Sequence, residues 1–287
     1  MEKAPRECIL CGGTDRVPLV RDGQWTVHKC TGCGLGVLDP RPDPAELGDL
    51  YQESYFECHY ENVLPPGSDG MRRRLSQERH RVDFFRRYKS GGKLLDVGSG
   101  RGYFLEACRL RGYDVVGFDV SGDAAASVRD TLGIEVKTGE MREDLFGSGS
   151  LDVVTMWHAL EHTPDPRVPL RLAWRWLAPD GILVVDVPNH ESTDARRIGN
   201  AWNDWSLPYH FFHFTPSSLE GLLDRNGFRP VEAKTYHSEY VKGRLRKIPL
   251  VSLLARPIAN LYTGASVAVV ARKSGPTSRG GDRASGD

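Results

Sequence analysis

The feature that most constrains the fold is a regular alternation of strand-like and helix-like segments between Lys93 and Val187. Short runs rich in Val and Ile, with little polar alternation, are typical of parallel strands whose two faces are covered by helices. Five such runs are predicted as strands: 94–97, 115–118, 134–137, 153–157 and 182–187. Two later segments, near 228–238 and 263–272, are expected to complete a doubly wound, seven-stranded α/β sheet.

A glycine-rich turn follows the first predicted strand. Gly98, Gly100 and Gly102 lead from this strand into a helix, at the place where nucleotides bind in doubly wound sheets. Glycine permits positive φ and close approach of a ligand, and a helix N-terminus offers free amides. The third glycine comes one residue earlier than in the nicotinamide fingerprint G-x-G-x-x-G, and Asp96 precedes the turn. The pattern favours a ligand with an ammonium group and no pyrophosphate.

A second carboxylate, Asp119, ends the next predicted strand, 23 residues after Asp96. A carboxylate at this place can accept both hydrogens of a ribose diol. With the motif D-x-G-x-G-x-G before it, the segment 93–187 resembles the class I S-adenosylmethionine-dependent methyltransferases, which have a Rossmann-like fold. The resemblance implies that the three glycines line the methionine moiety and that Asp119 holds the ribose.

The same resemblance assigns residues to the adenine and to the sulfonium. Glu140 matches the position that contacts the adenine amino group, with Met141 beside the ring, although the family more often has Asp there. His158 lies near the end of the fourth predicted strand and is expected to line the sulfonium side. His162 ends a Leu-Glu-His sequence that the family often shows after this strand, where a structural role as a loop-fixing hydrogen-bond partner is the alternative.

Two cysteine pairs occupy the N-terminal segment. Cys8-x2-Cys11 and Cys30-x2-Cys33, with 18 residues between the pairs, have the spacing of a four-cysteine zinc site. A closed set of four thiolates leaves no open position, which predicts a structural Zn²⁺ rather than a catalytic ion or redox pairs. About 39 residues cannot fold on hydrophobic burial alone, so the metal is expected to stabilise a small zinc ribbon.

The segment 208–216 contains two histidines and four aromatic residues between the fifth strand and the next helix. Because two histidines are costly to bury without partners, this segment is predicted to form a pocket wall. Together with the cysteine pairs it resembles zinc-carrying methyltransferases of bacterial sugar and natural-product pathways. In the deoxysugar C-methyltransferases among them a Glu-His pair acts in catalysis; His210 matches that histidine, and Tyr209 replaces the Glu. Histidine titrates near working pH, so His210, His162 and His213 are the candidate general bases, and a reaction without a protein base is the alternative.

The chain is expected to have four parts. Residues 1–39 form the zinc ribbon, 40–90 a linker with cap helices, 91–272 the cofactor-binding domain and 273–287 a disordered tail. Aromatic residues in 51–60 are expected to cap the cofactor. The mixed basic and apolar insertion at 240–261 is interpreted as a lid or a homodimer surface, with a membrane-contact patch as a third interpretation.

Charge and hydropathy limit the partners. Lys and Arg together number 38, as do Asp and Glu, so no global field steers the chain toward nucleic acid. No run approaches the roughly 18 apolar residues of a membrane span, and the cysteine usage suits a reducing compartment, so a cytoplasmic protein is expected.

The predicted function is methyl transfer from S-adenosylmethionine to oxygen or carbon of a small molecule, a sugar or an intermediate of secondary metabolite biosynthesis. The alternatives are an RNA base methyltransferase, weakly favoured by the arginines within 72–87, and a zinc-bearing scaffold with a vestigial cofactor site.

Overall fold

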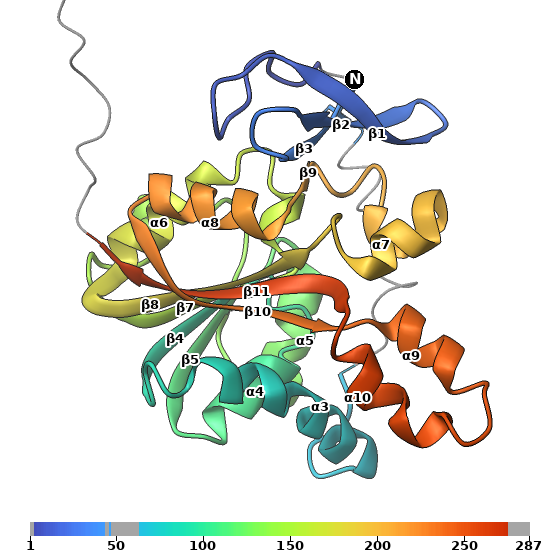
Figure 1. The fold of residues 1–287 in the computed structure, drawn as a ribbon. Coiled ribbons are helices and arrows are strands. Elements are labelled where there is room, and N and C mark those ends of the chain that lie inside the picture. The colour runs from blue at the N-terminus through green and yellow to red at the C-terminus, as the bar shows by residue number, and fades with distance from the viewer. Residues whose placement is uncertain (1–2, 44–45, 47–62, 275–287) are drawn as a thin grey trace, which may run out of the picture.

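The fold is a central seven-stranded sheet covered by helices on both faces, with a four-stranded ribbon beside one helical layer (Figure 1). The computed structural model describes residues 3–43, 46 and 63–274. The aromatic stretch predicted to cap the cofactor and all of the predicted tail beyond residue 274 lie outside the described residues. No helix in the described ranges is long and apolar enough to cross a membrane.

The large sheet has the strand order β10-β11-β8-β7-β4-β5-β6. Its neighbouring strands are parallel except β11, which is antiparallel to both β8 and β10. All seven predicted segments form strands, which confirms the doubly wound Rossmann-like α/β fold. The strands are β4 (Gly92–Val97), β5 (Tyr113–Phe118), β6 (Val136–Lys137), β7 (Leu151–Trp157), β8 (Leu177–Pro188), β10 (Phe228–His237) and β11 (Thr263–Lys273). The order reverses at β4, so a ligand crevice is expected where the carboxyl ends of β4, β5 and β7 diverge.

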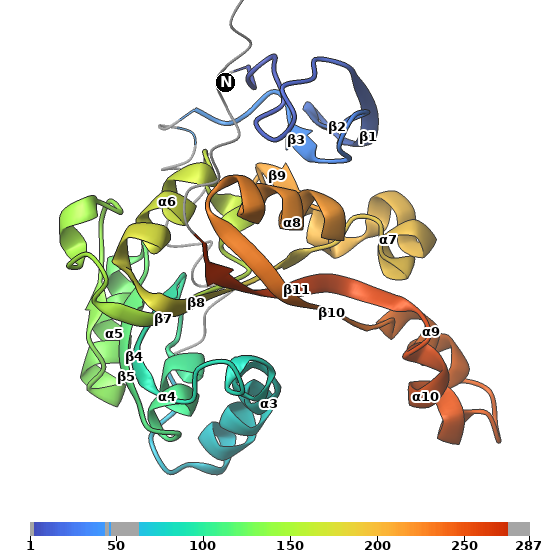
Figure 2. The same ribbon diagram turned by 60° about the vertical axis from the view of Figure 1, so that its left-hand side comes forward.

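Helices lie on both faces because successive strand residues point to opposite sides. Leu94 packs in one buried cluster and Leu95 in the other, and both side chains are fully buried. The first cluster includes residues of α3 (Asp69–Phe85), α4 (Tyr103–Arg109) and α5 (Gly122–Leu132); the second includes residues of α6 (Arg167–Trp176) and α8 (Pro216–Arg225). Figure 2 shows α3 and α4 below the sheet and α6 and α8 above it. A capping box formed by Thr215 and Ser218 starts α8.

The N-terminal ribbon is completed by a short strand from the C-terminal half of the chain. Its sheet has the order β1-β2-β3-β9, with β1 (Arg16–Asp22), β2 (Trp25–Cys30) and β3 (Gly36–Leu38) followed by β9 (Phe212–His213). Gly36 pairs with His213 and Val37 with Phe212. His190 adds a second link, since its Nε2 lies 2.9 Å from the carbonyl oxygen of Gly34. The ribbon is therefore joined to the segment that carries two of the candidate histidines.

This pairing corrects one expectation from the sequence. The aromatic residues of 208–216 were predicted to line a pocket, but Phe211, Phe212 and Phe214 are fully buried at the junction between ribbon and domain. The guanidinium of Arg41 lies over Phe212, 4.7 Å from the ring centroid, and over Phe211 at 5.7 Å. The aromatic residues thus pack the junction instead of a pocket.

The insertion before the last strand forms a helical hairpin. It consists of α9 (Glu239–Leu245), η5 (Ser252–Leu254) and α10 (Ala255–Ala259), and it projects from the end of β10 and β11 in both ribbon views. Helical structure in this insertion is interrupted around Pro249, as expected for a residue that cannot donate a backbone hydrogen bond. The helix α7 (Thr193–Ile198) packs beside α9.

Candidate active site

Asp119 ties the glycine turn to the end of β5. Its Oδ2 accepts a hydrogen bond of 2.7 Å from the amide of Gly100, and its Oδ1 accepts one of 2.9 Å from the amide of Ser121. Burial is the main cause that raises the pKa of this carboxyl, and the two amides oppose the rise. The structure therefore brings the predicted ribose acid and the predicted methionine loop together at the carboxyl edge of the sheet.

Two glycines of the turn are required by close packing. Gly98 has φ 77°, and a Cβ there would lie 3.0 Å from the Cβ of Ala159. Gly102 begins α4 with φ 69°, where a Cβ would lie 2.8 Å from a methyl group of Val128. Both conformations are unfavourable for other residues, so the turn can hold its shape only with glycine.

Asp96 lies inside β4 and is almost fully buried. The hydroxyl of Thr155 in the neighbouring β7 donates to it at 2.6 Å. Burial raises its pKa to about 7 despite this hydrogen bond. A cationic ligand group beside this carboxyl would favour its ionised form, which is the role predicted from the sequence.

The predicted adenine side lies after β5 and β6. Glu140 is exposed, whereas Met141 is half-buried and packs on the core. Sequence reasoning missed Val120, which follows Asp119 directly and has a side chain that is 70% exposed. An apolar residue immediately after the strand-ending acid is the signal that could have found it. Val120 and Met141 offer apolar contacts to a planar ring, while the roles of Glu140 and Met141 stay predictions.

His158 adopts an unusual conformation at the end of β7. Its φ is 53°, a left-handed value uncommon for residues other than glycine. Its Nδ1 lies 3.4 Å from Glu161 and its Nε2 lies 3.7 Å from Asp186, a buried acid that the sequence analysis did not single out. Burial opposes the charged form, but the two carboxylates outweigh it and raise the pKa of His158 to about 9. The ring is therefore a cation at neutral pH, with two acids to compensate its charge.

A second group of titratable side chains lies deeper, around η2 (Leu160–His162). Ligand atoms of Glu161, His162 and His210 lie within 4.8 Å of one another, and the two imidazole rings meet edge to face with centroids 4.5 Å apart. Glu161 is fully buried, and apart from the ion pair of its Oε1 with Nδ1 of His158 its oxygens accept no hydrogen bond from the described residues. These three side chains are placed to exchange a proton with a substrate or to hold a cation.

The protonation state of His210 follows from its surroundings. Its Nδ1 lies 3.0 Å from the carbonyl oxygen of Asp204, which can only accept, so Nδ1 carries the hydrogen and Nε2 keeps a lone pair. Burial, together with the charges of the neighbouring histidines, lowers the pKa of His210 well below its usual range. His210 is thus a neutral imidazole with a fixed tautomer at pH 7.

The other two candidate bases differ from His210. His162 is half-buried, donates to the backbone carbonyl of Tyr209, and has a pKa lowered mainly by burial. His213 lies in β9, is buried, and has an Nε2 without a hydrogen-bond partner among the described residues. Burial lowers its pKa to about 3, and its backbone pairs with Gly36 of the ribbon, so His213 belongs to the junction between ribbon and domain.

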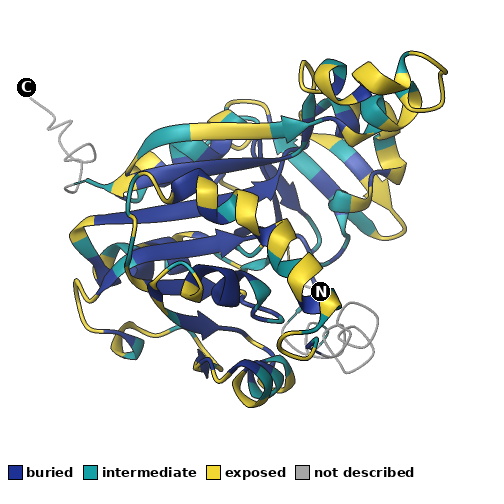
Figure 3. Ribbon diagram, turned by 90° about the horizontal axis from the view of Figure 1, so that it is seen from below, coloured by how far each residue is buried: buried dark blue, intermediate teal, exposed yellow. Residues whose placement is uncertain are grey.

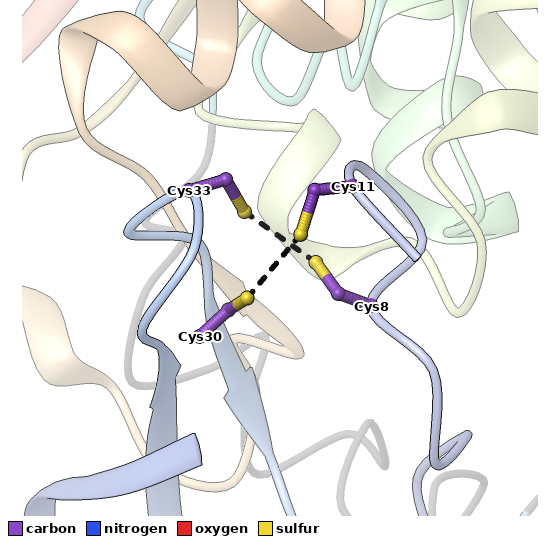
Figure 4. A group of neighbouring side chains, drawn as sticks. All are labelled: Cys8, Cys11, Cys30 and Cys33. Carbon is purple, nitrogen blue, oxygen red and sulfur yellow. Dashed lines mark hydrogen bonds between the residues drawn. The ribbon is translucent and has the colours of Figure 1, made fainter. Parts of the chain in front are cut away.

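The four N-terminal cysteines converge on one point (Figure 4). Cys8 and Cys33 have sulfurs 3.5 Å apart, and the sulfurs of Cys11 and Cys30 are 3.4 Å apart. Zn–S bonds of about 2.3 Å place tetrahedral sulfurs roughly 3.8 Å apart, whereas a disulfide needs about 2.05 Å. The arrangement fits a tetrahedral metal ion. It lies apart from the histidine cluster, beside a surface groove of about 600 Å³ between the ribbon and α8.

Comparison with known proteins agrees with this geometry. The family described as "Methyltransferase domain" matches residues 69–233, more than half of the chain. A ubiquinone biosynthesis O-methyltransferase of Marinobacter nauticus is 38% identical over 109 residues, covering 35% of this chain and 45% of that protein. Its counterpart in Psychrobacter arcticus is 37% identical over 109 residues, covering 35% of this chain and 42% of that protein. The chain thus spans less than half the length of these curated relatives.

Solved structures show the same fold at lower identity. A SAM-dependent methyltransferase from Archaeoglobus fulgidus superposes with a TM-score of 0.55 at 23% identity, covering 70% of this chain and 94% of that one. The 1,6-didemethyltoxoflavin-N1-methyltransferase of Burkholderia thailandensis, solved with S-adenosylhomocysteine, has a TM-score of 0.54 at 19% identity and covers 90% of this chain and 99% of that one.

The sheet order, the glycine turn and the acid at the end of β5 define the Rossmann-like class of nucleotide-cofactor enzymes. Within that class the chain belongs to the S-adenosylmethionine-dependent methyltransferases, as the family match shows. The class predicted from the sequence is therefore confirmed.

Proposed function

We propose that the protein transfers the methyl group of S-adenosylmethionine to a hydroxyl oxygen of a small molecule, with His210 as the general base. The observation that carries this proposal is the neutral imidazole of His210 beside the buried carboxylate of Glu161 at the carboxyl edge of the sheet. The names of the curated relatives, which are O-methyltransferases, support oxygen as the acceptor atom. Transfer to an enolisable carbon of a sugar or natural-product intermediate is the variant that the sequence resemblance favours.

The cofactor supplies an electrophilic methyl group on a cationic sulfur, so the protein mainly has to bind, align and deprotonate. Asp119 and the glycine turn would hold the ribose and the methionine moiety, and Val120 and Met141 would contact the adenine. The carboxylates of Glu161 and Asp186 neutralise the charge of the cationic His158, so this residue would not repel the sulfonium of the cofactor.

Proton transfer is assigned to the deeper cluster. The Nε2 of His210 accepts the hydroxyl proton as the oxygen attacks, while its Nδ1 hydrogen bond to Asp204 keeps the ring oriented. The imidazolium that forms is then stabilised by the nearby Glu161, whose Oε1 also pairs with Nδ1 of His158. His162 is the second candidate for the same step. If the reaction needs no protein base, replacing His210 or His162 should have little effect on the rate.

We also propose that Cys8, Cys11, Cys30 and Cys33 hold a structural Zn²⁺. Backbone amides of Gly13, Gly32 and Leu35 point toward the sulfurs, which favours thiolates. The metal would fix the ribbon whose strand β3 pairs with β9, two residues from His210.

RNA is a less favoured acceptor. Several arginines of the basic segment already pair with acids: Arg72 with Asp69, Arg74 and Arg81 with Glu78, and Arg87 with Glu232. A solvated, internally paired helix face accounts for these charges without a nucleic-acid partner.

The experiment incubates purified protein with methyl-labelled S-adenosylmethionine and either a metabolite extract or purified ribosomal RNA. The proposal predicts label in a small molecule, and NMR of the ¹³C-labelled product then separates a methoxy group from a C-methyl group. Label only in RNA would contradict the proposal. A chelator arm is included, because activity that depends on added divalent cation would reassign Glu161, His162 and His210 to a metal site.

A further inference from the structure

The hairpin formed by residues 239–262 concentrates exposed apolar side chains. Ten large apolar residues are exposed in the described chain, and six of them lie in this short segment: Ile248, Leu250, Leu253, Leu254, Leu261 and Tyr262. Figure 3 shows the hairpin as a projection with many exposed residues beside the sheet. Exposed apolar side chains gathered in one short segment point to an interaction site.

The base of the hairpin is firmly attached to the domain. Asp194 of α7 is buried and accepts hydrogen bonds from the hydroxyl of Ser238 and from the amides of Glu239 and Tyr240. The amide of Ser238 donates to the carbonyls of Ala259 and Tyr262, which joins the two arms. The exposed leucines are therefore presented by an ordered platform.

The tip directs its side chains outward. Leu250 has φ 68°, in the left-handed region where glycine or asparagine is usual, and its side chain is 90% exposed. Leu253, in the following turn, is 87% exposed. The tip thus presents both leucines to solvent, and Leu250 does so from a backbone conformation that other residue types adopt more readily.

Positive charge surrounds these leucines. The segment holds five basic residues and one acid, Glu239, which pairs with Lys242 and contacts His237. The remaining basic side chains are exposed, and no ion pair involves them among the described residues: Arg244, Arg246, Lys247 and Arg256. In a chain with equal numbers of acidic and basic residues, this is a local excess of positive charge.

We propose that the hairpin docks on the surface of an anionic lipid bilayer. The leucines of the tip enter the boundary between head groups and acyl chains, and the four unpaired basic side chains contact anionic head groups. A second copy of the chain fits less well, because two identical hairpins would bring like charges together. Docking would hold the methyltransferase domain at the membrane without any spanning segment.

The experiment is flotation of the purified 287-residue protein with vesicles of phosphatidylcholine, with and without phosphatidylglycerol. Binding is expected only to the anionic vesicles and is expected to weaken as salt is raised. L250S/L253S should lower the partition coefficient about tenfold or more. R244Q/R246Q/K247Q should lower it by roughly fivefold for each charge removed.

Matched controls change the same chemistry elsewhere. Leu110→Ser removes an exposed leucine outside the hairpin, and R73Q/R79Q/R86Q removes three exposed arginines of the α3 region. Both should bind vesicles like wild type. Absence of binding to anionic vesicles by folded wild-type protein would overturn the proposal. Light scattering that shows a dimer abolished by L250S/L253S, without vesicle binding, would assign the hairpin to a second copy instead.

Discussion

Asp119 is the single residue on which cofactor binding depends most, because its two oxygens organise the glycine turn and face the predicted ribose. Charge-assisted hydrogen bonds contribute about 1.5–3 kcal/mol each, so Asp119→Ala should weaken S-adenosylmethionine binding by about tenfold or more. Calorimetric titration measures the change. Asp123→Asn, in the first turn of α5, is the matched control and should bind normally. An unchanged dissociation constant in folded Asp119→Ala would refute the ribose role.

His210 offers a sharper test of chemistry. His210→Gln should preserve the fold and cofactor affinity but lower kcat by roughly 10²- to 10⁴-fold, the usual contribution of a general base. Single-turnover measurements at saturating acceptor isolate the chemical step. A kcat within about threefold of wild type would exclude the catalytic role, and a loss confined to KM and thermal stability would make His210 structural.

The pH profile adds a second readout for the same residue. A base must be unprotonated to act, and the pKa of His210 is lowered well below its usual value by burial and by its histidine neighbours. Activity of wild type should therefore persist as pH falls through 6.5 and decline only at lower pH. An acid limb centred above pH 6.5 would indicate a base in a more exposed setting.

Among the structural elements, those indicated by a few consecutive residues could be predicted from the sequence, whereas pairings between distant segments could not. The turn at Gly98, Gly100 and Gly102 could be predicted because its glycines and the flanking acid lie within a few consecutive residues. The pairing of β3 with β9 joins residues 36 and 213, which no local pattern reveals, and it turned the predicted aromatic wall into a buried junction. The left-handed His158 and its partner Asp186 were equally hidden, because they depend on where β7 and β8 end.

The N-terminal ribbon is expected to depend on all four cysteines for its metal and for the order of its strands. Cys30→Ser should lower bound zinc below about half an equivalent per chain, because three thiolates hold the ion less well than four. Hydrogen exchange at the β9 amides should speed up, because β3 loses its anchor. Elemental analysis and exchange mass spectrometry measure the two effects. Cys108→Ala, a buried cysteine of α4 outside the ribbon, should retain about one equivalent; full zinc in Cys30→Ser would contradict the four-thiolate site.

For the whole molecule, buried histidines make stability depend on pH. The pKa of His213 is about 3 in the folded state and about 6.5 when unfolded, so the unfolded chain binds its proton first as pH falls. This contribution to stability is present above pH 6.5 and is lost below it, by about 1.4 kcal/mol for each pH unit. His213→Phe should flatten the dependence between pH 6.5 and 5 in denaturant titrations. An equal slope in both proteins would show that His213 is not buried as a neutral ring.

The arrangement of the whole molecule also concentrates the chemistry at one edge of the sheet, where Asp96, Asp119 and the cluster around Glu161 lie at or near the carboxyl ends of neighbouring strands. The ribbon and the hairpin attach at different places along the segment that follows β8, the ribbon at β9 and the hairpin at Asp194 of α7.

The most direct test of the central claim is calorimetric titration of S-adenosylhomocysteine into the folded wild-type protein. We predict saturable binding of one molecule per chain, weakened by Asp119→Ala but unaffected by His210→Gln, since the first residue faces the cofactor and the second the acceptor. Absence of binding at ligand concentrations up to about 1 mM, where even weak complexes of about −4 kcal/mol are half-formed, would contradict the assignment of this crevice to the cofactor.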